Sequence, residues 1–444
     1  TNKLATKEIH NYSYVDGSNS ANDKYGVTEL TYDTYGNVTH LTGPENYDGD
    51  RMDVDFTYDT ELHQYILGVT NNSYGYQTCY KYNYKTGNLL KTQDINGQPT
   101  EYVYDDFYRL KAVWGPKEIH NTSSGPAISF EYYPKGYDNT TSDPLTKIPV
   151  AVTNHNVNDN NPSSGNPNLS FDCATISNFS SRPPITDPLR TATFMDGAGR
   201  VIQVKKDVTK ASGVSNDVYR EVSGNIKYDR AWRKISAAQS ENEAVSETIG
   251  KLALGVDDNK TTTTYDYMNR PLSQDVPLMQ PVSFTYEWNT DLTDKRFCTI
   301  TEQSYTSHGN TVDIDNRQYV NEMRQVIATS NSGAITTFEY DPLNQLLQSE
   351  DPIAAVTTYN YDLMGRVTRE EHPDRGITSY EYDDAGNLTG QVLPSTSPDA
   401  IVLEYYYTRL VSKTVPAYYS NGYTHHQDVF YHVLPYHFYN NSLG

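Results

Sequence analysis

The chain has 444 residues and a formal net charge of −21, and its aromatic residues are 40 Tyr, 11 Phe and 3 Trp. Such an acidic field repels phosphate groups, which argues against nucleic acid and anionic membranes as partners; we interpret it first as a source of solubility, with an acidic lumen or a calcium-dependent surface as the alternative. No apolar run approaches the roughly 18 residues that a membrane-spanning helix needs, and the first residues show no signal-peptide pattern.

The three cysteines, Cys79, Cys173 and Cys298, are far apart in the sequence and odd in number. They form no Cys-x-x-Cys pair, so the sequence predicts neither a disulfide framework nor a zinc site. The chain starts at Thr1 without an initiator Met, and we therefore expect a fragment whose own start lies elsewhere.

Residues 1–115 introduce a repeated Tyr-Asp phrase. Its first full copy, Thr31–Val38, places Asp33 at the first corner and Gly36 at the fourth corner of a type I turn. In a later copy, Tyr359 and Tyr361 alternate with polar residues, as is typical of a half-buried strand. Each copy therefore predicts a β-hairpin with a short bulged turn. One hairpin alone is marginal in water, so many must pack together.

Variants of the phrase follow within the same segment. Tyr58-Asp59 lacks the glycine, Tyr82–Leu89 is one residue longer, and Tyr104-Asp105 has Tyr108 in the glycine position. A bulge or an altered loop absorbs such differences. Asn96-Gly97 adds a separate hairpin signal.

Residues 116–190 interrupt the rhythm. Asn154–Ser181 is rich in Asn, Ser and Pro, and Pro183-Pro184 follows soon after. This composition predicts an irregular insertion or a loop excursion over the surface.

Residues 191–414 form the main predicted array. Tyr340, Tyr361 and Tyr382 are each 21 residues apart, and ten Tyr-Asp dipeptides occur in the whole chain where roughly three are expected by chance. We also predict degenerate units at Val312–Arg317 and Tyr319–Arg324, and a short helix within Ala237–Leu254. The residues expected to build the repeat turns are Tyr32, Asp33, Gly36, Tyr104, Asp105, Asp196, Gly199, Tyr228, Asp229, Tyr265, Asp266, Tyr340, Asp341, Tyr361, Asp362, Gly365, Tyr382, Asp383 and Gly386.

Residues 415–444 drop the motif and form an atypical C-terminal tail. The tail holds the one His-dense stretch of the sequence, with His425, His426, His432 and His437. No cysteine or acidic ligand spacing accompanies these histidines, so we expect no metal site there.

The repeated phrase resembles the YD-repeat (Rhs-repeat) family, whose motif is Tyr-Asp-x-x-Gly-Arg or Gly-Asn followed by apolar residues. The resemblance runs from about Thr31 to Thr414, with residues 116–190 as a gap. Within the family, Ile148–Thr153 together with Pro188–Asp207 looks like the middle part of the B component of bacterial insecticidal toxin complexes. The resemblance implies an all-β fold, in which hairpins form a spiral, shell-like sheet that encloses a toxic polypeptide. It also implies a secreted or cell-surface bacterial protein.

Two departures from the family limit this expectation. The related Rhs proteins end in a core with an aspartyl self-cleavage site and an Asp-Pro-x-Gly motif, whereas Asp351-Pro-Ile-Ala354 lacks the glycine and lies inside a repeat. The resemblance therefore predicts an incomplete shell with one long irregular insertion, completed by an encapsulated polypeptide or a complementary shell-forming subunit.

The repeated aspartates invite comparison with catalytic carboxylate pairs or calcium ligands. Their common place at a first turn corner gives a structural reason, since the carboxylate accepts backbone N–H groups there. The recurring Arg109, Arg200, Arg233, Arg270 and Arg366 are expected to pair across strands with an acidic residue of a neighbouring unit. We find no catalytic motif of a known class and expect no cofactor, no metal and no catalytic residue.

Three functions remain open from the sequence. The favoured one is a structural shell segment of a secreted toxin without a catalytic role. The second is a cell-surface adhesion or carbohydrate-binding protein, because exposed Tyr and Trp on a sheet suit glycans. The third is a hydrolase with paired aspartates.

Overall fold

The computed structural model describes residues 6–13, 24–46, 48–121, 123–138, 140–156, 173–209, 218–244, 248–253, 259–289, 296–307, 310–321, 323–383, 386–393, 401–406, 409–420 and 423–430. These residues form two antiparallel sheets. The first has fifteen strands in the order β1 (Lys7–Ser13), β2 (Lys24–Tyr32), β3 (Val38–Glu45), β4 (Arg51–Tyr58), β5 (Ile66–Asn71), β6 (Tyr76–Tyr82), β7 (Leu89–Gln93), β8 (Pro99–Tyr104), β9 (Leu110–Trp114), β10 (Ile128–Tyr133), β11 (Val150–His155), β12 (Leu189–Met195), β13 (Val201–Thr209), β14 (Val218–Val222) and β17 (Glu241–Ala244).

The second sheet has seventeen strands in the order β15 (Ile226–Tyr228), β16 (Lys234–Ala238), β18 (Lys260–Tyr265), β19 (Pro271–Asp275), β20 (Val282–Asn289), β21 (Arg296–Ser307), β22 (Asn310–Val320), β23 (Val326–Asn331), β24 (Ala334–Tyr340), β25 (Leu346–Glu350), β26 (Val356–Tyr361), β27 (Val367–His372), β28 (Gly376–Tyr382), β29 (Leu388–Val392), β30 (Ile401–Tyr406), β31 (Arg409–Ser420) and β32 (Tyr423–Phe430). In the described residues, helical structure is limited to α1 (Pro116–His120) and the 3-10 turn η2 (Pro144–Thr146). The predicted all-β hairpin array is confirmed.

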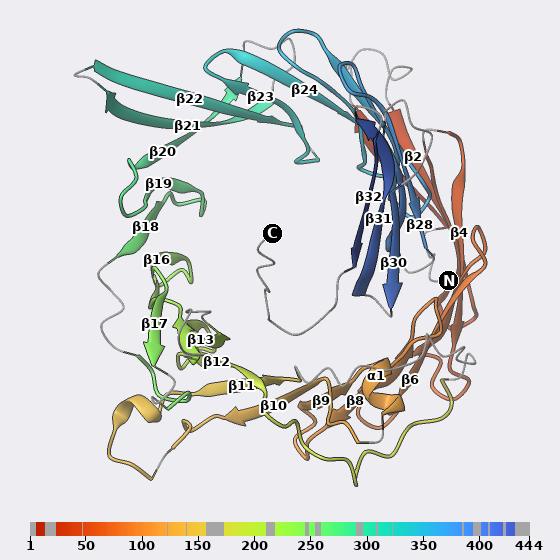
Figure 1. Ribbon diagram of the computed structural model, residues 1–444, viewed down its shortest axis with the longest axis vertical. Coiled ribbons are helices and arrows are strands. Elements are labelled where there is room, and N and C mark those ends of the chain that lie inside the picture. Colours follow the sequence, from red (N-terminus) through yellow and green to blue (C-terminus); the bar gives the residue numbers. More distant parts are fainter. Residues whose placement is uncertain are drawn as a thin grey trace.

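The strands succeed one another around a ring (Figure 1). Strands that are consecutive in the sequence are neighbours in the sheets, except where β14 pairs with β17 while β15 and β16 begin the second sheet. Hydrogen bonding between strands does not close the ring, because each sheet keeps two edge strands.

Early and late hairpins of the array nevertheless touch. The hydroxyl of Tyr74, in the loop between β5 and β6, accepts a hydrogen bond of 2.9 Å from the backbone N–H of Leu363 across 289 residues of sequence. The Asn71 side-chain amide lies 3.5 Å from Met364 Sδ. Gly26 in β2 is so close to Pro342 that a Cβ built there would lie 2.9 Å from Pro342 Cβ. We call this contact between the first hairpins and the turns around 342 and 363 the seam.

The predicted bulged turn is present in the hairpins. In the β26–β27 hairpin, Gly365 N–H donates to Asp362 C=O at 3.0 Å and Asp362 N–H donates to Arg366 C=O at 3.0 Å. Gly365 has φ +79°, and the strand register shifts at Tyr361, which pairs with Val367. A type I turn followed by a left-handed residue produces this bulge, and it adds twist to the sheet.

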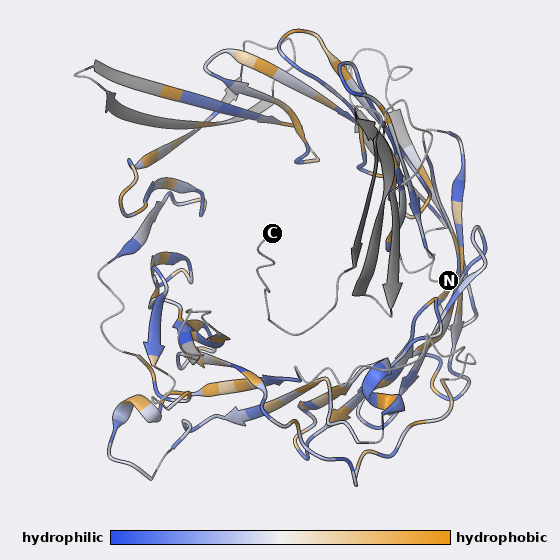
Figure 2. Cartoon of the chain, in the orientation of Figure 1, coloured by the Kyte–Doolittle hydropathy of each residue, from blue (hydrophilic) through white to orange (hydrophobic). Residues whose placement is uncertain are grey.

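A small apolar core lies on strands β11 and β12 of the first sheet. Val150, Val152, Ala192 and Phe194 from β11 and β12 are buried together with Ile249. Alternate residues of β11 are buried, as expected for a strand with one covered face. Elsewhere hydrophilic and hydrophobic residues are interspersed around the ring (Figure 2), and the stability of the wall is shared among many hairpins.

A buried ionic network continues from this core. Lys205 in β13 and Arg220 in β14 are both 1% exposed, and both pair with Glu243 of β17 at 2.5 and 3.3 Å. Arg220 also pairs with Asp207 at 2.8 Å. Because two buried cations need the Glu243 carboxylate, β17 is held to the first sheet by charge as well as by its strand pairing.

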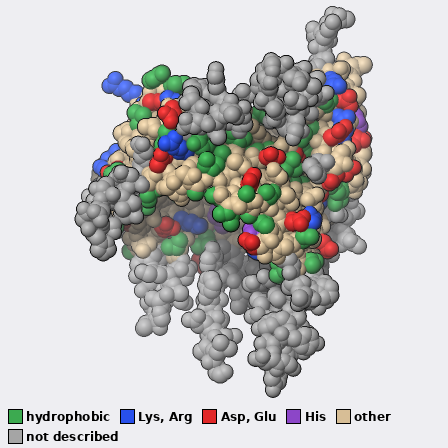
Figure 3. All heavy atoms as spheres, turned by 90° about the horizontal axis from the view of Figure 1, so that it is seen from above, with side chains coloured by type: hydrophobic (Ala, Val, Ile, Leu, Met, Phe, Trp, Pro, Cys, Tyr) green, Lys and Arg blue, Asp and Glu red, His purple; other side chains and the backbone are tan. Residues whose placement is uncertain are grey.

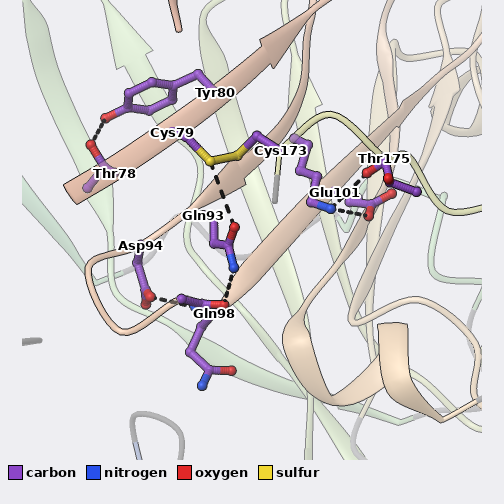
Figure 4. Close-up of a disulfide and its surroundings, with 11 residues drawn as sticks. Thr78, Cys79, Tyr80, Gln93, Asp94, Gln98, Glu101, Cys173 and Thr175 are labelled. Carbon is purple, nitrogen blue, oxygen red and sulfur yellow. Dashed lines mark hydrogen bonds and ion pairs between the residues drawn. A yellow bond between two sulfur atoms is a disulfide. The ribbon is translucent and has the colours of Figure 1, made fainter. Parts of the chain in front are cut away.

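Cys79 and Cys173 form a disulfide bond (Figure 4). The prediction that the fold has no disulfide was wrong, because the two cysteines are 94 residues apart in the sequence and meet only when residues 173–188 cross back over β6–β9. We call residues 173–188 the strap.

The strap is fixed to the sheet at several further points. Its Ser177 N–H and hydroxyl donate to the Glu101 carboxylate at 2.8 and 3.0 Å, and Glu101 is 1% exposed. Phe179 stacks on Trp114 with ring centroids 4.1 Å apart. The Arg182 guanidinium donates to the carbonyls of Ile119 and Asn121 at the end of α1.

Residues 116–190 are therefore not wholly an excursion. Ile128–Tyr133 and Val150–His155 pair with each other as β10 and β11, and burial alternates along β11. Outside α1, the 3-10 turn and the strands β10, β11 and β12, the described residues of this segment have no regular structure, and residues 173–188 among them form the strap.

Two smaller expectations were wrong, and a third lies partly outside the described residues. No helix forms in the described part of Ala237–Leu254; Glu241–Ala244 is strand β17, because it completes the sheet beside β14. Val312–Arg317 is not a turn but the middle of β22, whose long pairing with β21 needs it extended. Of the expected tail, residues 415–420 and 423–430 continue as β31 and β32, whereas His432 and His437 lie outside the described residues. No helix among the described residues is long and apolar enough to cross a membrane.

Candidate functional site: the repeat turns

Each repeat turn is organised by the carboxylate of its first residue. Asp196 Oδ1 accepts the N–H groups of Ala198 and Arg200 at 2.9 and 3.0 Å. The same two acceptances, from the residues two and four positions later, occur in the turns that begin at Asp33, Asp105, Asp229, Asp266, Asp341 and Asp362. For Asp383 the described contact is that with Asn387 N–H.

The recurring arginines pair within their own turns. Arg200 Nε donates to Asp196 Oδ2 at 2.7 Å, and the pairs at 105/109, 229/233, 266/270 and 362/366 repeat this geometry. The expectation that these arginines pair with an acidic residue of a neighbouring unit was wrong. The turn brings the two side chains together on one side of the hairpin, so the nearest carboxylate is local.

Neighbouring units recognise each other through the tyrosine instead. The Tyr361 hydroxyl donates to Leu346 C=O at 2.9 Å, and the Tyr382 hydroxyl donates to Val367 C=O at 2.8 Å. In both cases the acceptor is the first residue after the preceding turn. The same contact is made by the hydroxyls of Tyr58, Tyr104, Tyr132, Tyr228, Tyr265, Tyr286 and Tyr340.

The turn arginine completes this contact. The Arg366 guanidinium carbon lies 5.0 Å from the centre of the Tyr382 ring, and Arg366 Nη1 donates to Asp383 C=O at 2.8 Å. Arg200 and Arg233 lie in the same way over Tyr228 and Tyr265, with matching contacts to the next turn. A cation over an aromatic face attracts the ring. We call the turn arginine and the backbone carbonyl after the turn, which together bind the tyrosine of the next unit, the tyrosine socket.

The corner aspartates of two turns have pKa values shifted in opposite directions. The side-chain hydrogen bond from Arg200, followed by that from its backbone N–H, lowers the pKa of Asp196. Asp341 is 2% exposed and has Gln345 in the arginine position, and burial there raises its pKa. Asp341 lies next to Pro342 in the seam, which explains its burial.

The fourth position of each turn has a left-handed backbone. Gly36, Gly199, Gly365 and Gly386 occupy it with φ between +79° and +92°. In other turns it is taken by Tyr108, Trp232, Asn269, Arg324 and Asn344, with φ between +62° and +68°. These five side chains occupy the position at some cost in backbone strain, and Asn269 and Asn344 also accept hydrogen bonds from Arg233 and Gln325 of a neighbouring turn.

Two further turns are organised by a corner aspartate whose role the sequence analysis did not assign, although it predicted a hairpin at Asn96-Gly97 in one of them. Asp94 and Asp351 each accept two backbone N–H groups in the same pattern, in turns that end at Gln98 and Ala355. The sequence contains turn signals at both places: Asn96-Gly97 stands two residues after Asp94, and Pro352 follows Asp351. Both turns lie at the opposite end of their strands from the Tyr-Asp turns, so the sheet has two rims.

The connections between strands thus lie along two rims. The turn rim carries the Tyr-Asp turns (33–37, 59–65, 83–88, 105–109, 196–200, 229–233, 266–270, 321–325, 341–345, 362–366 and 383–387), and the loop rim carries the alternate connections (48–50, 72–75, 94–98, 115–121, 276–281, 332–333, 351–355 and 373–375). The seam joins the loop rim of the first sheet to the turn rim of the second.

The predicted turn residues thus occupy separate hairpins and are not gathered into one centre. Among the described residues no group of three or more His, Cys, Asp or Glu side chains could hold a metal ion. The arrangement has a structural effect: the same tyrosine contact joins each of these hairpins to the next along the sheet.

Residues 340–377, which contain two of these turns, match the family model described as RHS Repeat. This segment is an RHS repeat. The resemblance predicted from the Tyr-Asp phrases is therefore confirmed, and the physical content of the RHS repeat in this chain is the corner aspartate, its arginine and the tyrosine socket. A comparison with curated protein sequences finds no match.

Solved structures of toxin complexes are similar to this chain. The crystal structure of TcdB2-TccC3 is 14% identical over 92% of this chain and 21% of that chain, with a TM-score of 0.43. The Photorhabdus luminescens Tc holotoxin pore, with a mutation in TccC3, is 13% identical over 95% of this chain and 24% of that chain, with a TM-score of 0.45. The chain spans less than a quarter of the length of these neighbours.

Proposed function

We propose that this chain is a wall segment of a protein shell that encloses or carries a toxic polypeptide, with no catalytic role of its own. The observation that carries the proposal is the seam: one circuit of hairpins returns on itself after 289 residues, where Leu363 meets Tyr74. A wall that returns on itself can separate an inner space from solvent and from proteases. The partners of such a wall are an enclosed polypeptide and a complementary shell-forming subunit.

The chemistry of the wall supports a structural role. The corner carboxylates of the repeat turns accept backbone N–H groups, and most pair with an arginine of the same turn, so they are occupied in holding hairpins. On the face shown in Figure 3, acidic, basic and hydrophobic side chains are interspersed. Such a surface suits a scaffold better than a reaction centre.

The disulfide supports a secreted location. Disulfide bonds persist in oxidising compartments and are rare where glutathione keeps thiols reduced. The Cys79–Cys173 bond closes a loop across the strap, so it belongs to the folded wall.

Solution scattering and electron microscopy of the chain test the proposal. We expect a hollow, ring-shaped particle. Leu363→Pro removes the N–H that binds Tyr74, and proline suits the second position of this turn, as Pro342 shows in the preceding hairpin. This variant should open the ring, increase the radius of gyration and keep the strand content. A compact particle without a central space would exclude the shell.

A further inference from the structure

The tips of several repeat turns carry exposed apolar side chains. Phe107 is 76% exposed, Trp232 62%, Tyr267 91% and Met268 57%. They come from the turns at 105–109, 229–233 and 266–270, all on the turn rim. We call these four residues the apolar tips. A soluble wall gains nothing from a row of such residues unless something covers them.

A repeat turn without proline at its second position also leaves one backbone donor unused by the turn itself. In the Asp362 turn the corner carboxylate takes the N–H of Met364 and Arg366, and the Asp362 carbonyl takes that of Gly365. The second residue alone keeps its N–H. In Leu363 this donor binds Tyr74 in the seam; within the described residues the corresponding N–H groups of Arg230 and Tyr267 meet no protein acceptor.

The seam shows which chemistry covers a turn. Tyr74 offers its hydroxyl oxygen to the free N–H of Leu363. Asn71 offers its amide to Met364 Sδ at 3.5 Å. Leu363 is half-buried as a result, whereas Tyr267, in the same turn position, is almost fully exposed. Tyr267 and Met268 therefore lie where Leu363 and Met364 lie in the seam, without the covering loop.

A shallow, open hollow beside Trp232 can receive such a loop. It has a volume of ≈ 550 Å³ and is lined by Ala198, Arg200, Tyr228, Asp229, Arg230 and Trp232. The hollow lies between two successive turns of the turn rim, so a loop of another hairpin can enter it while its neighbours rest on the apolar tips.

We propose that the apolar tips dock the loop rim of a second YD-repeat sheet, which presents a tyrosine hydroxyl to the free N–H of the turn and an amide to Met268. The proposal rests on the shell function and names the surface at which another piece of wall joins. The occupant is a sheet other than a copy of this chain, because Tyr74 is the tyrosine that the described loops of this loop rim carry, and the seam already uses it.

A reactive hairpin tests this docking even when binding is weak. The probe is a backbone-cyclised peptide of residues 66–82 with Cys79→Ser, in which position 71 carries a chloroacetamide group. It is mixed with the full chain bearing Met268→Cys on the turn rim or, as a matched control, Met279→Cys on the loop rim. Met279 is 64% exposed against 57% for Met268, so intrinsic accessibility favours the control.

We expect alkylation of Met268→Cys at least about tenfold faster than that of Met279→Cys. Replacing Tyr74 by Phe in the probe should slow the reaction at Met268→Cys about fivefold, which is the loss of one hydrogen bond. Equal rates at the two positions, or no effect of the Phe probe, would overturn the proposal and leave the tips as a nonspecific apolar surface. Because alkylation does not depend on a central space, this outcome is separate from the scattering test of the shell.

Discussion

The residue that each repeat turn depends on most is the aspartate at its first corner, and its environment sets its response to pH. In Asp196 the hydrogen bonds from Arg200 favour the charged form. In Asp341 burial favours the protonated form. One residue type at one turn position therefore contributes to stability with opposite signs in the two hairpins.

These signs predict opposite effects of the same substitution. The contribution of Asp196, whose pKa is lowered, is present above the unfolded aspartate pKa of about 3.9 and is lost as pH falls through the folded value. The contribution of Asp341, whose pKa is raised, is lost as pH rises through its folded value. At pH 7 Asp196→Asn should lower the melting temperature, and Asp341→Asn should raise it.

Melting curves of both variants between pH 3 and pH 7 check this prediction. The Asp341→Asn difference should shrink toward pH 3, because the raised pKa of Asp341 leaves its carboxyl neutral there, whereas the Asp196→Asn difference should begin to shrink only below the unfolded aspartate pKa of about 3.9. The same sign for the two variants at pH 7 would contradict the assigned environments.

The left-handed turn position gives a second prediction at this scale. Gly199 has φ +79° and no atom within 4 Å of an added Cβ, so Gly199→Ala adds backbone strain alone and should cost about 1 kcal/mol. Ala354 already holds φ +64°, and Ala354→Gly should stabilise the chain by about 0.5 kcal/mol, since relief of strain exceeds the entropy of glycine. Denaturant titration of the two variants measures both changes, and destabilisation by Ala354→Gly would refute the argument.

At the scale of the element, a hairpin is held to its neighbour by more than strand pairing. Tyr382 inserts its ring under Arg366 and donates its hydroxyl to Val367 C=O at 2.8 Å. The contact repeats along the array, so the array behaves as a line of nearest-neighbour couplings.

Removal of one hydroxyl should therefore weaken one coupling. Tyr382→Phe keeps the ring under Arg366 but leaves the Val367 carbonyl without this donor, and should cost about 1 kcal/mol. Tyr267→Phe is the matched control, because Tyr267 is 91% exposed at a turn tip and its hydroxyl should contribute nothing to folding. Hydrogen exchange of the amides in β27 and β29 localises the effect. Equal free energies of unfolding for the two variants would show that the Tyr382 hydroxyl does not stabilise the array.

At the scale of the whole molecule, the disulfide and the strap connect distant hairpins. The Cys79–Cys173 bond joins residues 94 positions apart, and in the chain-entropy description a loop of this length stabilises the fold by roughly 4–5 kcal/mol. Cys79→Ser should lower the denaturation midpoint strongly and make the chain insensitive to reductant, whereas Cys298→Ser should not. Denaturation with and without dithiothreitol measures both. A wild-type chain indifferent to dithiothreitol would contradict a structural role of the bond.

The sequence by itself determined the local unit. Asp at a first corner, Gly or Asn at the left-handed position and alternating tyrosines restrict the backbone within five or six residues, so the hairpins around 33, 196, 362 and 383 could be predicted with their turn type. It also determined that the fold is an all-β repeat array, because hairpins that are marginal alone must pack on neighbours. These properties depend on contacts between residues close in the chain.

Only the tertiary structure decided the contacts that join distant parts. Cys79 meets Cys173 because the strap crosses the sheet, Tyr74 meets Leu363 because the wall returns on itself, and Glu243 meets Lys205 because β17 pairs with β14 beside β13. The curvature is a sum of small twists at each bulged turn, and no single turn encodes it. For the same reason the arginines were assigned to the wrong partners: spacing places Arg366 near both Asp362 and the next unit, and side-chain direction decides which carboxylate it reaches.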